Sequence, residues 1–158
     1  GGVLSAGPAR LTAATKRGVP QVVSVGATDM VNFHAPDTVP AKFAERVFYE
    51  HNPTVTLMRT TREENRKLGA EIGRKVAPAG KKAVILLPER GVSAIDAEGK
   101  PFDDTQARNE LFTAVEQNAG EVACRRIEAH INDAAFAEAA ANQLIELIRQ
   151  AAPRNTKA

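Results

Sequence analysis

Short runs of apolar, often β-branched residues alternate along the chain with stretches in which apolar residues recur at helical spacing. This pattern predicts buried strands at 21–25 and 54–58, and the continuous apolar run within 82–87 is the clearest strand signal. The stretch 121–128 alternates between apolar and polar residues, which predicts a fourth strand. We expect these four segments to belong to one sheet.

Helices are predicted between the strands. Pro8 is expected to open a first helix that stops at Gly18, because proline favours the first turn and glycine the position after the end. Thr61, with Glu64 three residues later, predicts a capping box for a second helix. Three further helical segments are expected: a short one at 40–46 and two longer ones that start at the caps Asp104 and Asp133.

This order of elements predicts an α/β fold, a Rossmann-like or flavodoxin-like three-layer sandwich with helices on both faces of a mostly parallel sheet. Four strands are few for such a fold, so a first strand is expected upstream of Gly1, in a longer protein. Residues 1–152 are expected to form a single α/β domain, in which 27–53 is a long loop or an inserted lobe. The tail 153–158 is expected to fray.

Composition excludes several classes of partner. The chain has 158 residues, of which 43% are apolar and 25% charged, as in an ordinary globular domain. A net charge of +2 and the absence of Trp argue against nucleic acid as a partner. The longest apolar run, 83–87, is too short to cross a bilayer, so no membrane partner is expected. The lone Cys124 and the absence of a signal peptide indicate the cytoplasm.

Polar segments follow the predicted strands at their carboxyl ends, where ligands bind in open α/β sheets. Arg59 and Thr60 follow the second strand, and Arg90, Gly91 and Ser93 follow the third. A guanidinium group can hold a phosphate or carboxylate in a bidentate fork, and helix starts offer free N–H groups. This edge is therefore predicted to bind an anion, although each arginine could equally form a surface ion pair.

The turn before the first predicted helix joins this set of candidates. Ser5, Gly7 and Arg10 lie at that helix start, and Gly7 would allow a ligand to approach the backbone closely. A plain turn without a ligand is the alternative interpretation.

Candidates for catalysis are few. His130 and Asp29 each follow a predicted strand and could act as acid or base. Asp29 is also a candidate magnesium ligand, as are Asp96, Asp103 and Asp104. The chain lacks the G-x-x-x-x-G-K-[ST], G-x-G-x-x-G and G-x-S-x-G motifs, which argues against a standard P-loop NTPase, Rossmann dehydrogenase or α/β-hydrolase.

Nine short motifs occur together in a fixed order. They are LSAGPARL at 4–11, PQVVS at 20–24, DMVNF at 29–33, HNP at 51–53, LMRTT at 57–61, EEN at 63–65, LP at 87–88, RGVS at 90–93 and HIND at 130–133. As a set they resemble the ATP-binding domain family named after the tomato protein that confers resistance to tomato mosaic virus. Its bacterial and fungal members form an uncharacterised protein family. The chain is similar to the C-terminal half of the two α/β halves of that family.

The resemblance implies ATP and magnesium as ligands and the missing N-terminal half as a partner. Taken together with the predicted anion-binding edge of the sheet, the resemblance assigns roles to individual residues. Phosphates would be held by Ser5, Gly7, Arg10, Arg59 and Thr60, with Arg90, Gly91 and Ser93 as a third anion-binding segment. Gly26 would let the ligand approach the backbone, and the base, ribose or second substrate would contact Asn32, His51 and Asn52.

Three functions stay open at this point. The first is a nucleotide-binding domain, part of a larger two-half protein of unknown reaction. The second is a hydrolase or lyase acting on a small phosphorylated or carboxylate metabolite, with His130 or Asp29 as acid or base and Arg59 as anion clamp. The third is an oligomerisation or partner-docking half-domain, for which the Ala-rich last helix offers a surface. A homo-oligomer is expected.

Overall fold

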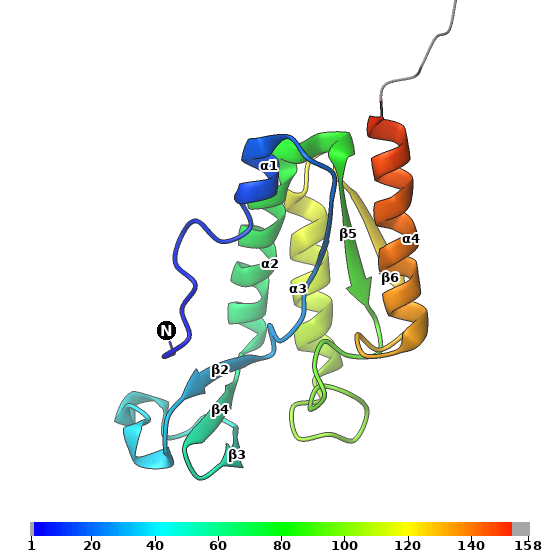
Figure 1. Cartoon of the computed structure of the whole chain (residues 1–158). Helices are drawn as coiled ribbons and strands as arrows, with labels where there is room; N and C mark the ends of the chain where they lie inside the picture. Colours follow the sequence, from blue (N-terminus) through cyan, green and yellow to red (C-terminus); the bar gives the residue numbers. More distant parts are fainter. Residues whose placement is uncertain (1, 153–158) are drawn as a thin grey trace, which may run out of the picture.

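The chain builds two separate sheets. The computed structural model describes residues 2–152, and the frayed tail expected at 153–158 lies outside them. A parallel sheet (sheet A) stands between helices, and a small antiparallel sheet (sheet B) lies beyond one end of it (Figure 1). We call residues 27–59, which contain sheet B, the lobe.

Sheet A consists of β1 (Gln21–Ser24), β5 (Ala83–Pro88) and β6 (Ala123–Ile127) in the order β1-β5-β6. The outer strands β1 and β6 each pair with β5 in parallel. Every residue of β5 is buried, as a continuous apolar run predicts for a strand covered on both faces. Three of the four predicted strands therefore lie in the parallel sheet, as expected.

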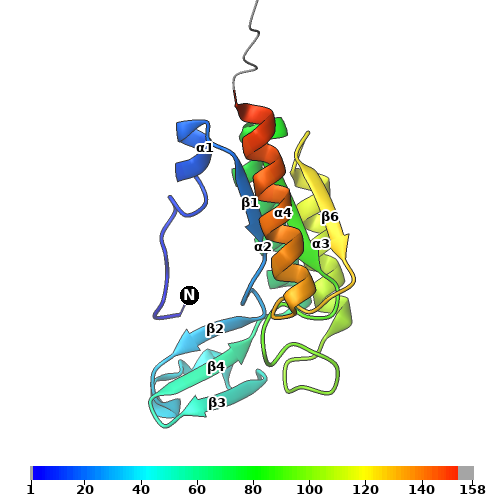
Figure 2. The same ribbon diagram turned by 45° about the vertical axis from the view of Figure 1, so that its right-hand side comes forward.

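Helices cover both faces of sheet A (Figure 2). On one face lie α2 (Arg62–Val76) and α3 (Thr105–Asn118), and Leu111 of α3 belongs to the core on that side. On the other face lies α4 (Ala134–Ala151), whose Leu147 joins a second core. The arrangement is a three-layer α/β sandwich of Rossmann-like type, as predicted.

The strand predicted at 54–58 belongs to sheet B instead of sheet A. Sheet B contains β2 (Met30–Phe33), β3 (Phe48–Asn52) and β4 (Val55–Arg59) in the antiparallel order β2-β4-β3. The strand predicted at 54–58 corresponds to β4, but its placement in the parallel sheet is wrong. Leu57 of β4 has a strand of the lobe on each side, so no edge of β4 is free to join sheet A.

The segment between β2 and β3 contains two 3-10 helices, η1 (Pro36–Thr38) and η2 (Ala41–Phe43). The short helix predicted at 40–46 is reduced to η2. The ring of Phe43 packs against that of Phe33 in β2, with centroids 5.9 Å apart. The segment is therefore held against sheet B by an aromatic contact.

The remaining helical segments are short. The first helix, α1 (Ala13–Arg17), ends at Gly18 as predicted but begins at Ala13 instead of Pro8, because Leu11 has a φ of +69° that interrupts helical geometry. The 3-10 segment η3 (Ala77–Lys82) links α2 to β5. No helix within residues 2–152 is long and apolar enough to cross a membrane.

Two of the three predicted helix caps form their hydrogen bonds. At the start of α2, Thr61 Oγ1 accepts from Glu64 N at 3.2 Å while Thr61 N donates to the Glu64 carboxylate at 2.7 Å. Asp104 accepts from the backbone N–H three residues later at 2.9 Å. Asp133 precedes α4, but its carboxylate accepts from His130 N at 2.8 Å instead of capping the helix.

Helices α2 and α3 approach each other at two glycines. A Cβ on Gly69 would lie 2.2 Å from the Leu111 carbonyl oxygen, and one on Gly73 would lie 2.7 Å from the Val115 carbonyl oxygen. The two helix backbones can come this close only because neither position carries a side chain. This contact sets how α3 and the loop before it are placed against sheet A.

Candidate functional site

Buried polar side chains gather where the carboxyl ends of sheet A meet the lobe. We call them the junction cluster. Each is at most 8% exposed: Asp29, Arg59, Thr60, Ser93, Asp96 and Arg108. The sequence predicts Asp29, Arg59, Thr60 and Ser93 at one edge of the sheet, and the structure brings these four together.

Asp96 is the centre of the junction cluster. Its Oδ1 accepts hydrogen bonds from Arg108 Nη1 at 2.8 Å and from Arg59 Nη2 at 3.3 Å, and its Oδ2 accepts from Val92 N at 3.0 Å. The carboxylate is fully buried, so two guanidinium groups balance its charge in place of solvent. The sequence predicts Asp96 as a candidate magnesium ligand, but both of its carboxylate oxygens already accept hydrogen bonds from protein groups.

Arg59 fastens the lobe to the loop before α3. Its Nε donates to the Phe102 carbonyl oxygen at 2.9 Å, and its Nη1 donates to the Asp29 carbonyl oxygen at 3.2 Å and to Thr60 Oγ1 at 3.1 Å. Together with the bond to Asp96, these contacts occupy all three guanidinium nitrogens. The role of Arg59 as a phosphate clamp stays a prediction, and this geometry does not favour it.

Asp29 and Ser93 form a short side-chain contact inside the junction cluster. Ser93 Oγ donates to Asp29 Oδ2 at 2.7 Å and accepts from the backbone N–H groups of Ile95 and Asp96, each at 3.2 Å. Asp29 Oδ1 is buried without a hydrogen-bond partner. Burial raises the pKa of Asp29 above its ordinary value, although the hydrogen bond from Ser93 opposes the rise.

The raised pKa of Asp29 predicts a pH-dependent stability difference between the protein and its Asp29→Asn variant. Above the unfolded-state pKa of about 3.9, the folded protein holds the Asp29 proton more tightly than the unfolded chain does. Stability from this group therefore falls as pH rises from about 4 through the folded-state pKa, and Asn removes that loss. Urea unfolding at pH 4, 5.5 and 7 should show the variant gaining relative stability with rising pH.

Because the other carboxylates are common to both proteins, their titration cancels in this comparison. A stability difference that is the same at all three pH values would contradict the raised pKa of Asp29.

Both ring nitrogens of His130 contact backbone groups. Its Nε2 lies 2.8 Å from the Ser93 carbonyl oxygen, which can only accept, so Nε2 carries the proton. Its Nδ1 lies 3.1 Å from Asn132 N, which can only donate, so Nδ1 is the acceptor. Both ring nitrogens are thus engaged within the protein, and the arrangement does not favour His130 as an acid or base.

A cleft of about 910 Å³ opens beside the junction cluster, at the carboxyl ends of β5 and β6, and we call it the β5–β6 cleft. It is lined by Glu89, Arg90, Ala97, Glu98, Asp103, Thr105, Arg108 and His130. Arg90 is exposed and pairs with the exposed Glu128 at 2.9 Å. Three of the candidates predicted from the sequence, Arg90, Asp103 and His130, therefore reach this cleft.

Arg108 connects the cleft to the junction cluster. Its Nη1 also binds the Asp103 carboxylate at 3.0 Å, and its Nη2 donates to Thr105 Oγ1 at 3.0 Å. Its Nε is buried and has no hydrogen-bond partner in the part of the chain that the structure describes. Burial alone would lower the pKa of Arg108, but the Asp96 and Asp103 carboxylates raise it overall, so the group stays charged.

Sequence reasoning does not identify Arg108. A signal exists nonetheless, because Arg108 lies at the start of α3, where the helix dipole disfavours a cation. Nearby carboxylates would offset this unfavourable interaction, and Asp96, Asp103 and Asp104 are close in sequence.

The other predicted ligand residues do not line the β5–β6 cleft. Ser5 and Asn32 line a different pocket of about 390 Å³, beside Leu68 of α2, and the buried Asn32 Oδ1 has no partner. Arg10 lines a hollow beside β1. His51 and Asn52 lie exposed at the end of β3, where Asn52 Oδ1 accepts from the backbone of the following turn.

The three predicted glycines have different surroundings. A Cβ on Gly7 would meet no atom within 4 Å, and one on Gly26 would lie 3.0 Å from Ile131 Cδ1. At Gly91, where φ is +135°, a Cβ would lie 1.8 Å from the Asp96 carbonyl oxygen. Of these three glycines, Gly91 is therefore the one at which a side chain would collide with the backbone of the junction cluster.

Comparison with known proteins places this chain in a family. Residues 1–148 match the family model described as the uncharacterised protein family (UPF0261) C-terminal domain. The chain belongs to this family. The predicted similarity to a C-terminal half is thereby confirmed for the UPF0261 domain, and a tomato ToMV resistance protein is among its relatives.

Relatives of the UPF0261 domain occur in bacteria and in a plant. The chain is 47% identical over 152 residues to a UPF0261 protein of Clostridium tetani, covering 95% of this chain and 38% of that protein. It is 50% identical over 143 residues to one of Rhizobium meliloti, covering 89% and 36%. It is 41% identical over 150 residues to the ToMV resistance protein Tm-1 of Solanum lycopersicum, covering 93% and 20%. The chain thus spans less than two fifths of these relatives.

The implied ligands of the UPF0261 domain can be tested against its side chains. The unpartnered Nε of Arg108 suits an anionic oxygen. No group of three or more His, Cys, Asp and Glu side chains within residues 2–152 could hold a metal ion alone. A nucleotide-bound Mg²⁺ needs only one or two protein carboxylates, because phosphates and water complete its shell, and Glu89 and Glu98 line the cleft. The cleft residues therefore fit a magnesium–phosphate group.

Proposed function

We propose that the UPF0261 domain binds a phosphorylated small molecule, and more finely a magnesium nucleotide such as ATP, in the β5–β6 cleft. The observation that carries this proposal is the buried, unpartnered Nε–H of Arg108 in a residue that lines the cleft. A buried donor without an acceptor costs about 1–3 kcal/mol. Since Nε itself is closed to solvent, the Arg108 side chain would turn toward the cleft, where a phosphate oxygen would accept this hydrogen bond and remove that cost.

The side chains of the cleft favour binding of the phosphate groups of a nucleotide over binding of its nucleobase. Arg90 and Arg108 are two charged donors on one cleft, and the Thr105 hydroxyl lies beside them. A bound Mg²⁺ would neutralise phosphate charge, and Glu89 and Glu98 would hold it. Within residues 2–152, no Phe, Tyr or Trp lines the cleft and His130 is its one aromatic ring, so little binding energy would come from base stacking. ATP and GTP should therefore bind with similar affinity.

Replacing Arg90 by alanine should weaken binding of Mg–ATP about tenfold, which corresponds to about 1.4 kcal/mol. Arg90 lies exposed at the cleft and, among residues 2–152, pairs with the exposed Glu128 alone, so its loss should leave the fold intact. Isothermal titration calorimetry of both proteins gives the ratio of dissociation constants. For a domain of this size, saturating nucleotide at a hundredfold excess should raise Tm by roughly 5–10 °C.

The matched control is Arg66→Ala. Arg66 is an exposed arginine paired with Glu63 on α2, outside the cleft, so this variant should bind Mg–ATP as the wild-type protein does. Equal weakening in both variants would show a general charge effect, and no binding to wild-type protein would refute the proposal.

The two alternative functions have less support from the geometry. Acid–base catalysis is not favoured, because both His130 nitrogens are engaged and Asp29 is fully buried. The homo-oligomer stays a prediction: Ile145 and Ile148 of α4 are about half exposed, and two apolar side chains are a small patch for an interface.

A further inference from the structure

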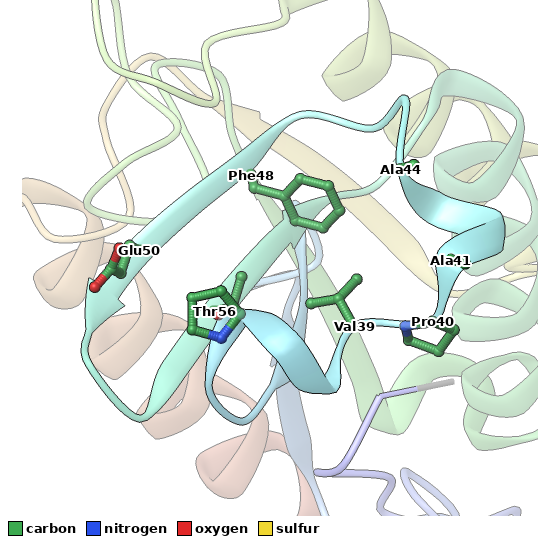
Figure 3. A pocket seen from close by; sticks show the side chains of 8 residues that line it. Val39, Pro40, Ala41, Ala44, Phe48, Glu50 and Thr56 are labelled. Carbon is green, nitrogen blue, oxygen red and sulfur yellow. The ribbon is translucent and has the colours of Figure 1, made fainter.

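A second pocket lies in the lobe, between sheet B and the segment that carries η1 and η2 (Figure 3). We call it the lobe pocket. Its volume is about 460 Å³, within the range of small-molecule sites. It shares no lining residue with the β5–β6 cleft, so its function does not depend on the proposal above.

Most of the lobe pocket wall is apolar. Phe48 of β3 and Val39 of the covering segment point toward each other across it (Figure 3). Two prolines and two alanines complete this part of the wall: Pro36, Pro40, Ala41 and Ala44. Such a surface favours the apolar body of a ligand over a phosphorylated or sugar-like molecule.

One buried polar group on this wall lacks a partner. Thr56 of β4 is 4% exposed, and its Oγ1 forms no hydrogen bond with any atom of residues 2–152. The Thr56 backbone is satisfied, because its N–H donates to the His34 carbonyl oxygen at 3.0 Å. The hydroxyl is therefore the group that a ligand could satisfy.

A carboxylate accompanies this hydroxyl. Glu50 of β3 pairs in register with Thr56 of β4, so both side chains lie on the same face of sheet B. Glu50 also lines the lobe pocket, at one end of it (Figure 3). It forms no ion pair with any side chain of residues 2–152. Its negative charge is thus open to a cation and opposes an anion.

We propose that the lobe pocket binds a small organic amine with an apolar body. The ammonium group donates hydrogen bonds to the Glu50 carboxylate and to Thr56 Oγ1. The Phe48 ring, which lies away from Glu50 in the pocket, packs against the apolar body (Figure 3). The apolar body packs against Val39 and the prolines.

The test compares three probes of the same shape and different charge on the intact protein: benzylamine, benzyl alcohol and benzoate. Titration followed by amide chemical shifts should show benzylamine binding most tightly, benzyl alcohol more weakly and benzoate not at all. Shifts should concentrate in residues 36–56, and saturating Mg–ATP should not displace benzylamine.

Two variants identify the groups responsible. Glu50→Gln should weaken benzylamine about tenfold, as expected for loss of a charged hydrogen bond, and leave benzyl alcohol unchanged. Ala44→Leu, which fills the pocket, should weaken both probes. The matched control is Glu45→Gln, an exposed carboxylate of the same segment outside the pocket wall, which should change neither.

Three results would overturn the proposal. One is equal binding of all three probes, which would leave an apolar pocket without charge selection. Another is equal benzylamine affinity in the Glu50→Gln and Glu45→Gln variants. The third is the absence of shifts in residues 36–56 at millimolar benzylamine.

Discussion

Replacing Asp96 by asparagine lowers the free energy of unfolding by about 3–5 kcal/mol, the range for removing one partner of a buried ion pair. Asp96 is the shared acceptor of Arg59 and Arg108, and neither arginine has solvent to replace it. An asparagine side chain offers one acceptor oxygen where the carboxylate offers two, so a buried donor also loses its acceptor. Urea denaturation followed by circular dichroism measures the loss, and Tm should fall by roughly 10 °C or more.

The control for this variant is Asp37→Asn in η1. Asp37 is exposed, and its replacement should change the free energy of unfolding by less than about 0.5 kcal/mol. If Asp96→Asn and Asp37→Asn unfold at the same urea concentration, the junction cluster does not stabilise the fold.

Replacing Gly91 by alanine destabilises the protein by roughly 3 kcal/mol or more, through two effects in the same position. Its φ of +135° strains any residue with a side chain. In addition, the new Cβ would lie 1.8 Å from the Asp96 carbonyl oxygen and 2.7 Å from His130 Cδ2, so the loop after β5 must move. Because Arg90 and His130 flank this loop, Mg–ATP binding should weaken as well.

A Gly99→Ala control distinguishes the backbone strain from the steric clash. Gly99 also has a positive φ, of +72°, but no atom lies within 4 Å of its missing Cβ. Gly99→Ala should therefore cost only the backbone strain, about 1–2 kcal/mol. Thermal melts of the two variants give the difference, and an equal loss of Tm in both would show that the clash at Gly91 is relieved without cost.

The fold could largely be predicted because its strongest signals are local. The apolar run of β5, the capping box at Thr61 and the cap at Asp104 each depend on a few neighbouring residues. The placement of β4 failed for the opposite reason. Apolar residues at 54–58 indicate a strand but not its partners, and β4 finds them in the lobe, at β2 and β3.

The site could be predicted only in part. The rule that ligands bind at the carboxyl ends of parallel strands selects Asp29, Ser93 and His130, which do lie close together. It cannot tell whether a polar side chain faces solvent or a protein acceptor, and Arg59 is turned inward by carbonyl groups from distant loops. Arg108 lies on a helix and not at a strand end, so the same rule misses it.

The distance along the chain between paired strands has a consequence for folding. Gln21 of β1 pairs with Ala83 of β5, about 60 residues later, with the whole lobe and α2 in between. The β3–β4 hairpin, by contrast, closes through Pro53 and Thr54 alone. Since the entropy of loop closure grows with loop length, the hairpin should form early and β1 should dock late. Mutations in β1 should then mainly speed unfolding, whereas mutations in the hairpin should slow folding.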